Sequence, residues 1–128
     1  MGLPGSGKTT FAGELKSAMP DYTWLNADIV RATYNDWDFS LEGRIRQATR
    51  MRELAAGTDA IIDMVCPLPE MRDIINADIT VWMDTISAGR YEDTNNMFVN
   101  PDNYHYRITA FDDATRASII DKILSSPR

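Results

Sequence analysis

Apolar and polar residues follow two different periods along this chain of 128 residues. Short, nearly continuous apolar runs are typical of buried strands, and they occur at 22–26, 60–65, 79–84 and 104–109. Stretches with apolar residues three or four positions apart are typical of helices, and they occur at 7–19, 41–56, 69–76 and 112–124. Because strands alternate with helices, the pattern predicts an α/β fold with a mostly parallel sheet and helices on both faces.

The carboxyl-terminal third divides into an irregular segment and a closing strand and helix. Residues 85–103 carry no apolar period, so we expect a mobile, lid-like segment with one brief helix there. In the last helix we expect four side chains to face the core: Ala114, Ala117, Ile120 and Leu124. No repeat, low-complexity tract or linker interrupts the chain, and we expect a single domain over 1–128.

The composition is that of an ordinary soluble globular protein, with 44% hydrophobic and 25% charged residues. No apolar run approaches the roughly 20 residues of a membrane span and no signal-peptide pattern opens the chain, so we expect a cytoplasmic protein without a membrane partner. The net charge of −6 argues against general affinity for nucleic acid. Cys66 and His105 are single residues of their types, which argues against zinc sites and Ser-His or Cys-His nucleophiles.

A phosphate-binding loop begins at the second residue. Residues 2–9 read Gly-Leu-Pro-Gly-Ser-Gly-Lys-Thr and fit the pattern G-x-x-x-x-G-K-[ST] without a departure. Glycines allow a tight bend whose backbone N–H groups point inward, Lys8 can reach the β- and γ-phosphates, and the Thr9 hydroxyl suits Mg²⁺. The loop predicts ATP and Mg²⁺ as cofactors, with these nucleotide-binding residues: Gly2, Pro4, Gly5, Ser6, Gly7, Lys8, Thr9 and Thr10.

The strand that usually leads into such a loop is absent from the pattern. A buried strand reads as about five apolar residues, and only Met1 precedes Gly2. Loss of a central strand would expose the edges of both neighbours, so the sequence favours a native start upstream of Met1.

Two carboxylates are candidates for the chemistry, one just past a predicted strand, on the edge where parallel sheets bind ligands, and one within a strand. Asp28 follows the first strand and forms D-x-x-R with Arg31. An Asp there can accept the proton of a substrate hydroxyl or help to hold Mg²⁺, and the Arg can bind an anion. Asp63 lies within an apolar strand, where it either touches Mg²⁺ through water or forms a structural hydrogen bond. We therefore expect a metal site at Thr9, Asp28 and Asp63.

The helix at 41–56 separates its arginines by direction. At about 100° per residue, Arg44 points into the apolar arc, whereas Arg46 and Arg50 point toward solvent. A charge on the inward arc needs an anionic partner or a wet cleft, so Arg44 is a candidate for substrate binding.

Loops beside this helix supply the other candidates. Phe39, with Trp37, is placed to stack on a base, and Pro67 forms a stiff wall after a strand. Arg72, behind this wall, is expected to be a surface charge. Arg90, in the segment 85–103, is a candidate catalytic arginine that closes over ATP.

Four motifs together resemble the adenylylsulfate kinase family. Residues 2–10 look like its G-x-x-G-S-G-K-T-T, 26–31 are similar to its D-G-D-x-x-R, and 39–44 look like its F-S-x-x-D-R. Pro67 with Arg72 is similar to its S-P-x-x-x-x-R. The resemblance implies a P-loop kinase-type three-layer sandwich that transfers the γ-phosphate of ATP to a hydroxyl of a small anionic, nucleotide-like acceptor. By the same match Asp28 is the base or metal-side acid, and Arg31 and Arg44 hold the acceptor's anionic groups.

The chain departs from the family pattern at several of these positions. Asn26 replaces the first acid of D-G-D, Gly43 replaces the Asp before the helix arginine, Gln47 replaces an Asn, and Cys66 replaces a Ser. The basic lid of the family is also much shorter here. These departures affect the identity of the acceptor more than the transfer of a phosphoryl group.

Two alternative functions remain open from the sequence. The 5′-polynucleotide kinases also join this loop to D-x-x-R after the second strand, so a polynucleotide or nucleoside 5′-hydroxyl kinase is one alternative, and only there is nucleic acid a partner. The acidic net charge and the lack of a basic channel favour the small acceptor. A degenerate, non-catalytic nucleotide-binding module is the other alternative.

Overall fold

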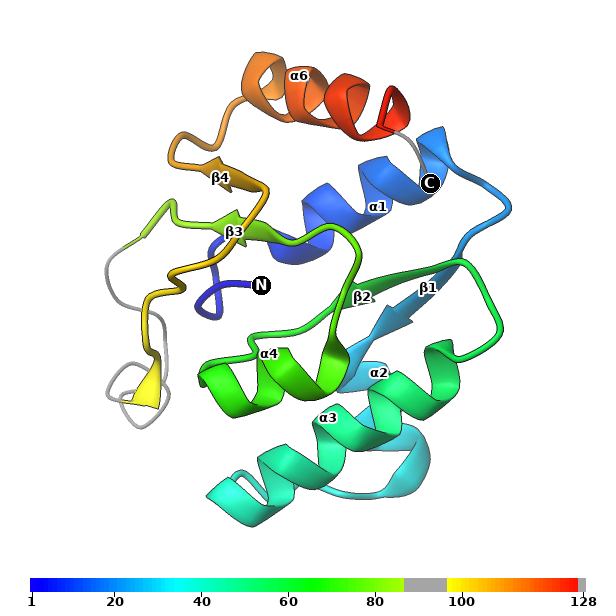
Figure 1. Ribbon diagram of the computed structural model, residues 1–128, viewed down its shortest axis with the longest axis vertical. Coiled ribbons are helices and arrows are strands. Elements are labelled where there is room, and N and C mark those ends of the chain that lie inside the picture. Colours follow the sequence, from blue (N-terminus) through cyan, green and yellow to red (C-terminus); the bar gives the residue numbers. More distant parts are fainter. Residues whose placement is uncertain (87–96, 127–128) are drawn as a thin grey trace.

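The computed structural model of the chain describes residues 1–86 and 97–126. Helices and strands alternate along it, as Figure 1 shows. Their bounds are α1 (Lys8–Ala18), β1 (Thr23–Asn26), α2 (Ala27–Tyr34), α3 (Leu41–Ala55), β2 (Ala60–Asp63), α4 (Pro69–Ile75), β3 (Val81–Met83), β4 (Tyr106–Ile108) and α6 (Asp113–Leu124).

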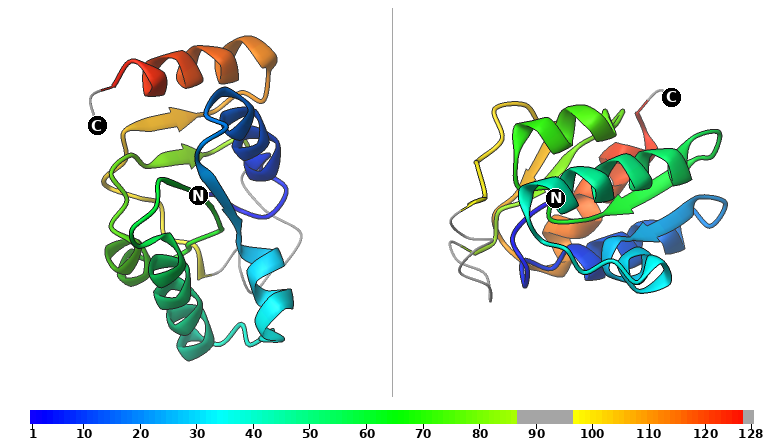
Figure 2. Two further views of the ribbon diagram at one scale, coloured as in Figure 1. Left: turned by 90° about the vertical axis from the view of Figure 1, so that its right-hand side faces the viewer. Right: turned by 90° about the horizontal axis from the view of Figure 1, so that it is seen from below.

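The strands form two parallel pairs. β1 pairs with β2 so that Asn26 lies opposite Asp63, and β3 pairs with β4. The amino terminus lies between the two pairs (Figures 1 and 2). Met1 donates a hydrogen bond from its nitrogen to Val81 O at 2.8 Å and accepts one from Met83 N at 2.8 Å, the pattern of a parallel bridge opposite Trp82. Met1 therefore takes the place of a strand residue beside β3.

Helices cover both faces of the strands, so the predicted α/β architecture is confirmed (Figures 1 and 2). On one face α1 and α6 pack with β3 and β4 around six buried side chains: Phe11, Leu15, Met83, Ile108, Ile119 and Ile120. On the other face α2, α3 and α4 enclose a second cluster: Val30, Ala48, Met51, Met64, Cys66 and Met71. The sheet itself is smaller than the apolar runs predicted, because each strand keeps only three or four paired residues.

Helix α2 is absent from the sequence prediction. It begins directly after β1, where the Asn26 side chain accepts a hydrogen bond from Ile29 N, and ends at Asn35, whose φ of 51° is left-handed. Asp28 and Arg31 therefore lie on a helix rather than on a loop. At eight residues the helix is too short for its apolar period to stand out.

The inward face of α6 agrees with the prediction at Ile120 and differs from it at the other three positions. Arg116, Ile119 and Ile120 are buried, whereas Ala114 and Ala117 are exposed and Leu124 is 49% exposed. The helix is rotated because the Arg116 guanidinium bonds to Glu14 Oε1 on α1 at 2.6 Å and lies 4.3 Å from the centre of the Phe111 ring. The spacing of apolar residues could not predict this face, because the buried Arg116 is charged.

Within residues 1–86 and 97–126, no helix combines the length and the apolar character needed to cross a bilayer.

Candidate functional site

The loop before α1 has an open cradle of backbone donors. Gly5 and Gly7 adopt left-handed conformations with φ of 88° and 98°, which residues with a side chain rarely enter. Gly7 is the N-cap of α1, and no side chain caps the helix there. The first N–H groups of a helix that lack a capping side chain, together with the positive end of its dipole, suit a bound anion. The cradle therefore fits the phosphates that the sequence motif predicts.

Lys8, Thr9 and Asp63 flank this cradle. Lys8 donates from Nζ to Leu3 O at 3.1 Å, which holds the lysine over the loop. The Thr9 hydroxyl donates to Asp63 Oδ2 at 3.0 Å, and Asn26 Nδ2 donates to the same oxygen at 2.9 Å. Asp63 is 6% exposed, so its carboxylate is buried but hydrogen-bonded. Because the Thr9 oxygen donates its proton to Asp63, its lone pairs remain for a cation, and this donor set fits Mg²⁺.

The remaining loop residues close the cradle from outside. Ser6 is buried, and its carbonyl accepts a hydrogen bond from the Thr85 hydroxyl at 2.7 Å. A Cβ on Gly2 would lie 2.5 Å from Met83 O, so the loop passes close to β3 only with glycine there. Pro4 is half-buried and Thr10 is exposed. Within the described residues, no cluster of three or more His, Cys, Asp or Glu side chains could hold a metal by itself.

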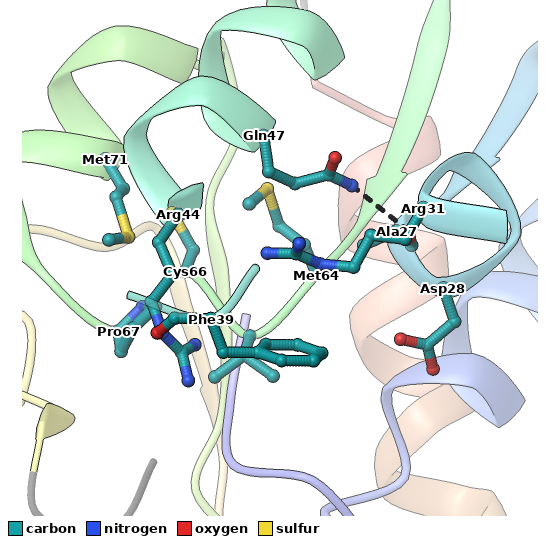
Figure 3. A pocket seen from close by; sticks show the side chains of 11 residues that line it. Ala27, Asp28, Arg31, Phe39, Arg44, Gln47, Met64, Cys66, Pro67 and Met71 are labelled. Atoms are coloured by element: carbon teal, nitrogen blue, oxygen red, sulfur yellow. Dashed lines mark hydrogen bonds between the residues drawn. The ribbon is translucent and has the colours of Figure 1, made fainter. Parts of the chain in front are cut away.

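A small pocket lies next to this loop, between α2, α3 and the turn after β2. Its volume is about 60 Å³, and Figure 3 shows its lining. The side chains of Arg31 and Arg44 are 4% and 7% exposed, and both guanidinium groups lie near the ring of Phe39, at 4.4 and 5.4 Å from its centre. Burial lowers the pKa of Arg31. The pocket thus combines two buried positive charges with an aromatic ring that is itself 49% exposed.

Backbone carbonyls hold the two arginines in place. Arg31 Nη1 donates to Asp36 O at 3.0 Å and to Asp38 O at 3.1 Å, and Arg44 Nε donates to Phe39 O at 2.9 Å. The two carbonyl oxygens satisfy donors of the Arg31 guanidinium without cancelling its charge, so Arg31, with Arg44 beside the same ring, suits the binding of an anion. The sequence prediction that Arg44 points inward agrees with its burial.

Asp28 lines the same pocket from the first turn of α2. Its side chain is exposed, and Figure 3 shows it on the α2 side of the pocket, apart from Phe39. Asp28 follows β1, on the edge that the sequence predicted for it, and Asp63 is the last residue of β2. Asp84, which follows β3 on this edge, instead pairs with Arg107 at 2.5 Å.

The wall after β2 consists of Cys66 and Pro67, and Arg72 supports it, which the sequence did not predict. Pro67 is buried, and Cys66 adopts a left-handed φ of 51°. Burial raises the pKa of the Cys66 thiol to about 11. Arg72 is not a surface charge: its guanidinium donates to Cys66 O at 2.9 Å, Pro67 O at 3.2 Å and Val99 O at 2.5 Å. It therefore binds the wall to the segment after residue 96.

Ion pairs hold the loop 36–40 on the outside of α3. Arg46 and Arg50, expected to face solvent, both bond to Asp36, at 2.8 and 3.0 Å. The hydrogen bond from Arg46, followed by that from Arg50, lowers the pKa of the Asp36 carboxyl well below its usual range. Gly43 allows the loop to approach, because a Cβ there would run into the Asp38 carbonyl. The Asp of the family pattern would meet the same obstacle.

Two predicted residues remain outside this arrangement. Arg90 lies in 87–96, outside the described residues. Trp37 is 51% exposed and its ring centre is 6.5 Å from that of Phe39, but it does not line the pocket.

Phe111 is a residue near the loop that sequence reasoning missed. Its ring lies against Gly7, where an added Cβ would collide with it, and the Arg116 guanidinium supports it from α6. Phe111 is 50% exposed and 104 positions from Gly7 in the chain, so no local signal in the sequence connects the two.

Neither a protein-family model nor a curated protein sequence matches this chain. Solved structures do match it. APS kinase CysC from Mycobacterium tuberculosis, in complex with AMPPNP and APS, has a TM-score of 0.79 at 21% identity, over 98% of this chain and 95% of that chain. A mutant of that enzyme with a cysteine changed to alanine has a TM-score of 0.76 at 23% identity, over 98% of this chain and 94% of that chain. Shikimate kinase from Acinetobacter baumannii, in complex with shikimate, has a TM-score of 0.63 at 20% identity, over 96% of this chain and 87% of that chain.

These similarities identify the fold. The chain has an APS kinase-like P-loop kinase fold, and the resemblance inferred from its motifs is confirmed at this level. The first of these structures holds AMPPNP, a nucleotide analogue. At 20–23% identity the similarity does not extend to a substrate.

Proposed function

We propose that the chain is an ATP-dependent phosphotransferase that moves the γ-phosphate to a hydroxyl of a small anionic, nucleotide-like acceptor, as an adenylylsulfate kinase does. One observation carries the proposal: the phosphate cradle and the arginine pocket are neighbours. Asp63 is bonded to Thr9 beside the phosphate cradle. Asn26 is bonded to the same Asp63 and caps α2, the helix that carries Asp28 and Arg31 of the pocket. A transferase needs two such half-sites side by side.

In the first half-site the cradle residues bind the triphosphate. The N–H groups of Gly5, Gly7, Lys8 and Thr9 donate to phosphate oxygens, whereas the Ser6 N–H keeps its bond to Leu3 O inside the loop. Lys8 exchanges its own bond to Leu3 O for the β- and γ-phosphates. Thr9 and Asp63 would hold Mg²⁺, the first directly and the second by accepting the Thr9 proton. When bound, the ion neutralises charge on the phosphate oxygens.

In the second half-site the pocket binds the acceptor. Arg31 and Arg44 are buried cations that favour a sulfate or phosphate group. Phe39 offers its exposed face to a planar ring, which supports a nucleotide-like acceptor. The volume of about 60 Å³ suits the anionic group, while the rest of the acceptor lies outside, against the exposed ring of Phe39.

The transfer exchanges one oxygen–phosphorus bond for another. The acceptor oxygen forms a bond to the γ-phosphorus, the bond from that phosphorus to the β–γ bridging oxygen breaks, and ADP leaves. Asp28 takes the hydroxyl proton or orients it, and its exposed position at the pocket rim supports this role. Arg90, as a predicted closing arginine, stabilises the transferring group.

The experiment is a panel of acceptors incubated with γ-labelled ATP: adenylylsulfate, shikimate, nucleosides and 5′-hydroxyl oligonucleotides. We expect label on adenylylsulfate, a loss of about tenfold or more in kcat/KM for Arg44→Lys because lysine lacks the planar fork, and less than twofold for Arg46→Lys on the outer side of the same helix. Label on oligonucleotides instead would favour the polynucleotide kinase alternative. Binding of ATP without transfer to any acceptor would favour the non-catalytic module.

A further inference from the structure

Asn26 stands where the family pattern has an acid, and its side chain makes two hydrogen bonds in opposite directions. Its Oδ1 accepts from Ile29 N at 3.1 Å and caps α2. Its Nδ2 donates to Asp63 Oδ2 at 2.9 Å. Only an amide can do both, because a carboxylate would cap the helix equally well but would have no proton for Asp63.

The two bonds fix two carboxylates at once. Asp63 is buried, and its Oδ2 receives one bond from Asn26 and one from Thr9, so that oxygen points at the phosphate cradle. Asp28 is in the first turn of the helix that Asn26 caps, and the cap sets where this turn begins.

Gln47, which also departs from the family pattern, bonds to the same turn from the other side. Gln47 on α3 is 2% exposed and donates from Nε2 to Ala27 O at 3.1 Å, the bond drawn in Figure 3. Its Oε1 accepts from Arg50 at 2.9 Å. Asn26 and Gln47 therefore hold the first turn of α2 from two sides, and this restrains the position of Asp28.

We propose that Asn26 is a positioning residue that aligns the acceptor half-site with the nucleotide half-site, holding Asp63 by a donated hydrogen bond and Asp28 through the helix cap. The inference rests on the proposed function, since it assigns Asp63 to the magnesium-nucleotide side and Asp28 to the acceptor side. An outer hydrogen bond to a metal-side ligand typically contributes about 10- to 100-fold in metal affinity or activity.

Two variants separate the two bonds of Asn26. Asn26→Ser keeps a helix cap but is too short to reach Asp63 as well, whereas Asn26→Ala removes both bonds. Both variants lose the bond to Asp63, so without ligand we expect Asn26→Ala to melt about 3 °C below Asn26→Ser, from the additional loss of the cap. Asn35→Gly, at the other end of α2, is the matched control, because glycine accepts its left-handed φ.

The deciding measurement is calorimetric binding of AMPPNP at increasing Mg²⁺. We expect Asn26→Ser to need about tenfold more Mg²⁺ for half-maximal binding than the wild type or Asn35→Gly. In the transfer assay its kcat should fall by about tenfold while the acceptor KM stays within about threefold, because Arg31 and Arg44 are untouched.

Wild-type magnesium dependence in Asn26→Ser would overturn the inference and leave Asn26 as a helix cap. A melting temperature of Asn26→Ser as low as that of Asn26→Ala would also overturn it, because the loss would then be structural. Failure of the proposed function looks different: the wild type itself would bind no AMPPNP with magnesium, and the inference would fall with it.

Discussion

The contact between Gly7 and Phe111 gives a sharp test of the phosphate cradle, through the substitution Gly7→Ala. Gly7 has a φ of 98°, and a Cβ there would run into the Phe111 ring. Gly57, after α3, has a φ of 76° and nothing within 4 Å of the same hypothetical atom. Gly57→Ala therefore measures the conformational cost alone, and Gly7→Ala measures that cost plus displacement of the ring.

The magnitudes follow from these two surroundings. A left-handed alanine costs about 1 kcal/mol, and we expect this value for Gly57→Ala. In Gly7→Ala the half-buried ring must also leave the Arg116 guanidinium at 4.3 Å, losing a cation–π contact and part of its burial, about 1 to 2 kcal/mol more. Phe111→Ala loses the same 1 to 2 kcal/mol, so the double variant should be about 1 to 2 kcal/mol more stable than the sum of the singles predicts.

Urea unfolding of the wild type and the four variants, without ligand, measures these differences. We expect Gly7→Ala to cost about 2 to 3 kcal/mol, about twice or more the cost of Gly57→Ala. Equal costs for the two glycine substitutions, together with additive effects of Gly7→Ala and Phe111→Ala, would refute the contact and the loop geometry that depends on it.

Two further predictions concern other parts of the molecule. Arg72→Lys should raise the acceptor KM about tenfold with ATP binding unchanged, whereas Arg52→Lys, which loses only a bond to Ile74 O, should change neither constant. Met51→Ala should cost about 3 kcal/mol of unfolding free energy, because Met51 is fully buried and leaves a cavity, and a cost below 1 kcal/mol would contradict its place in the core.

Local signals in the sequence were sufficient for much of the fold. Helix α3 begins at its predicted start, where Ser40 accepts a hydrogen bond from Gly43 N at 3.2 Å, and ends within one residue of its predicted end. The periodicity of this helix also predicted the inward direction of Arg44. Each of these features depends on residues a few positions apart, which is the range that propensity and periodicity report.

Features that depend on distant contacts could not be predicted in this way. Arg116 meets Glu14 across 102 positions and thereby rotates α6, and Arg72 meets Val99 across 27. The sequence around an arginine in a helix does not show which distant carbonyl or carboxylate will accept its hydrogen bonds. The site itself falls between the two cases: its loop and its D-x-x-R motif are local, but the bond from Asn26 to Asp63 exists only once β1 and β2 pair.

Calorimetric titration of the folded chain with ATP and Mg²⁺, in parallel with Lys8→Ala, tests the central claim most directly. The account predicts a single magnesium-dependent binding event in the wild type that Lys8→Ala weakens by about 100-fold, as expected when a charge-assisted contact to the phosphates is lost. Absence of magnesium-dependent binding in the wild type, or equal binding by Lys8→Ala, would contradict the assignment of the amino-terminal loop as a nucleotide site.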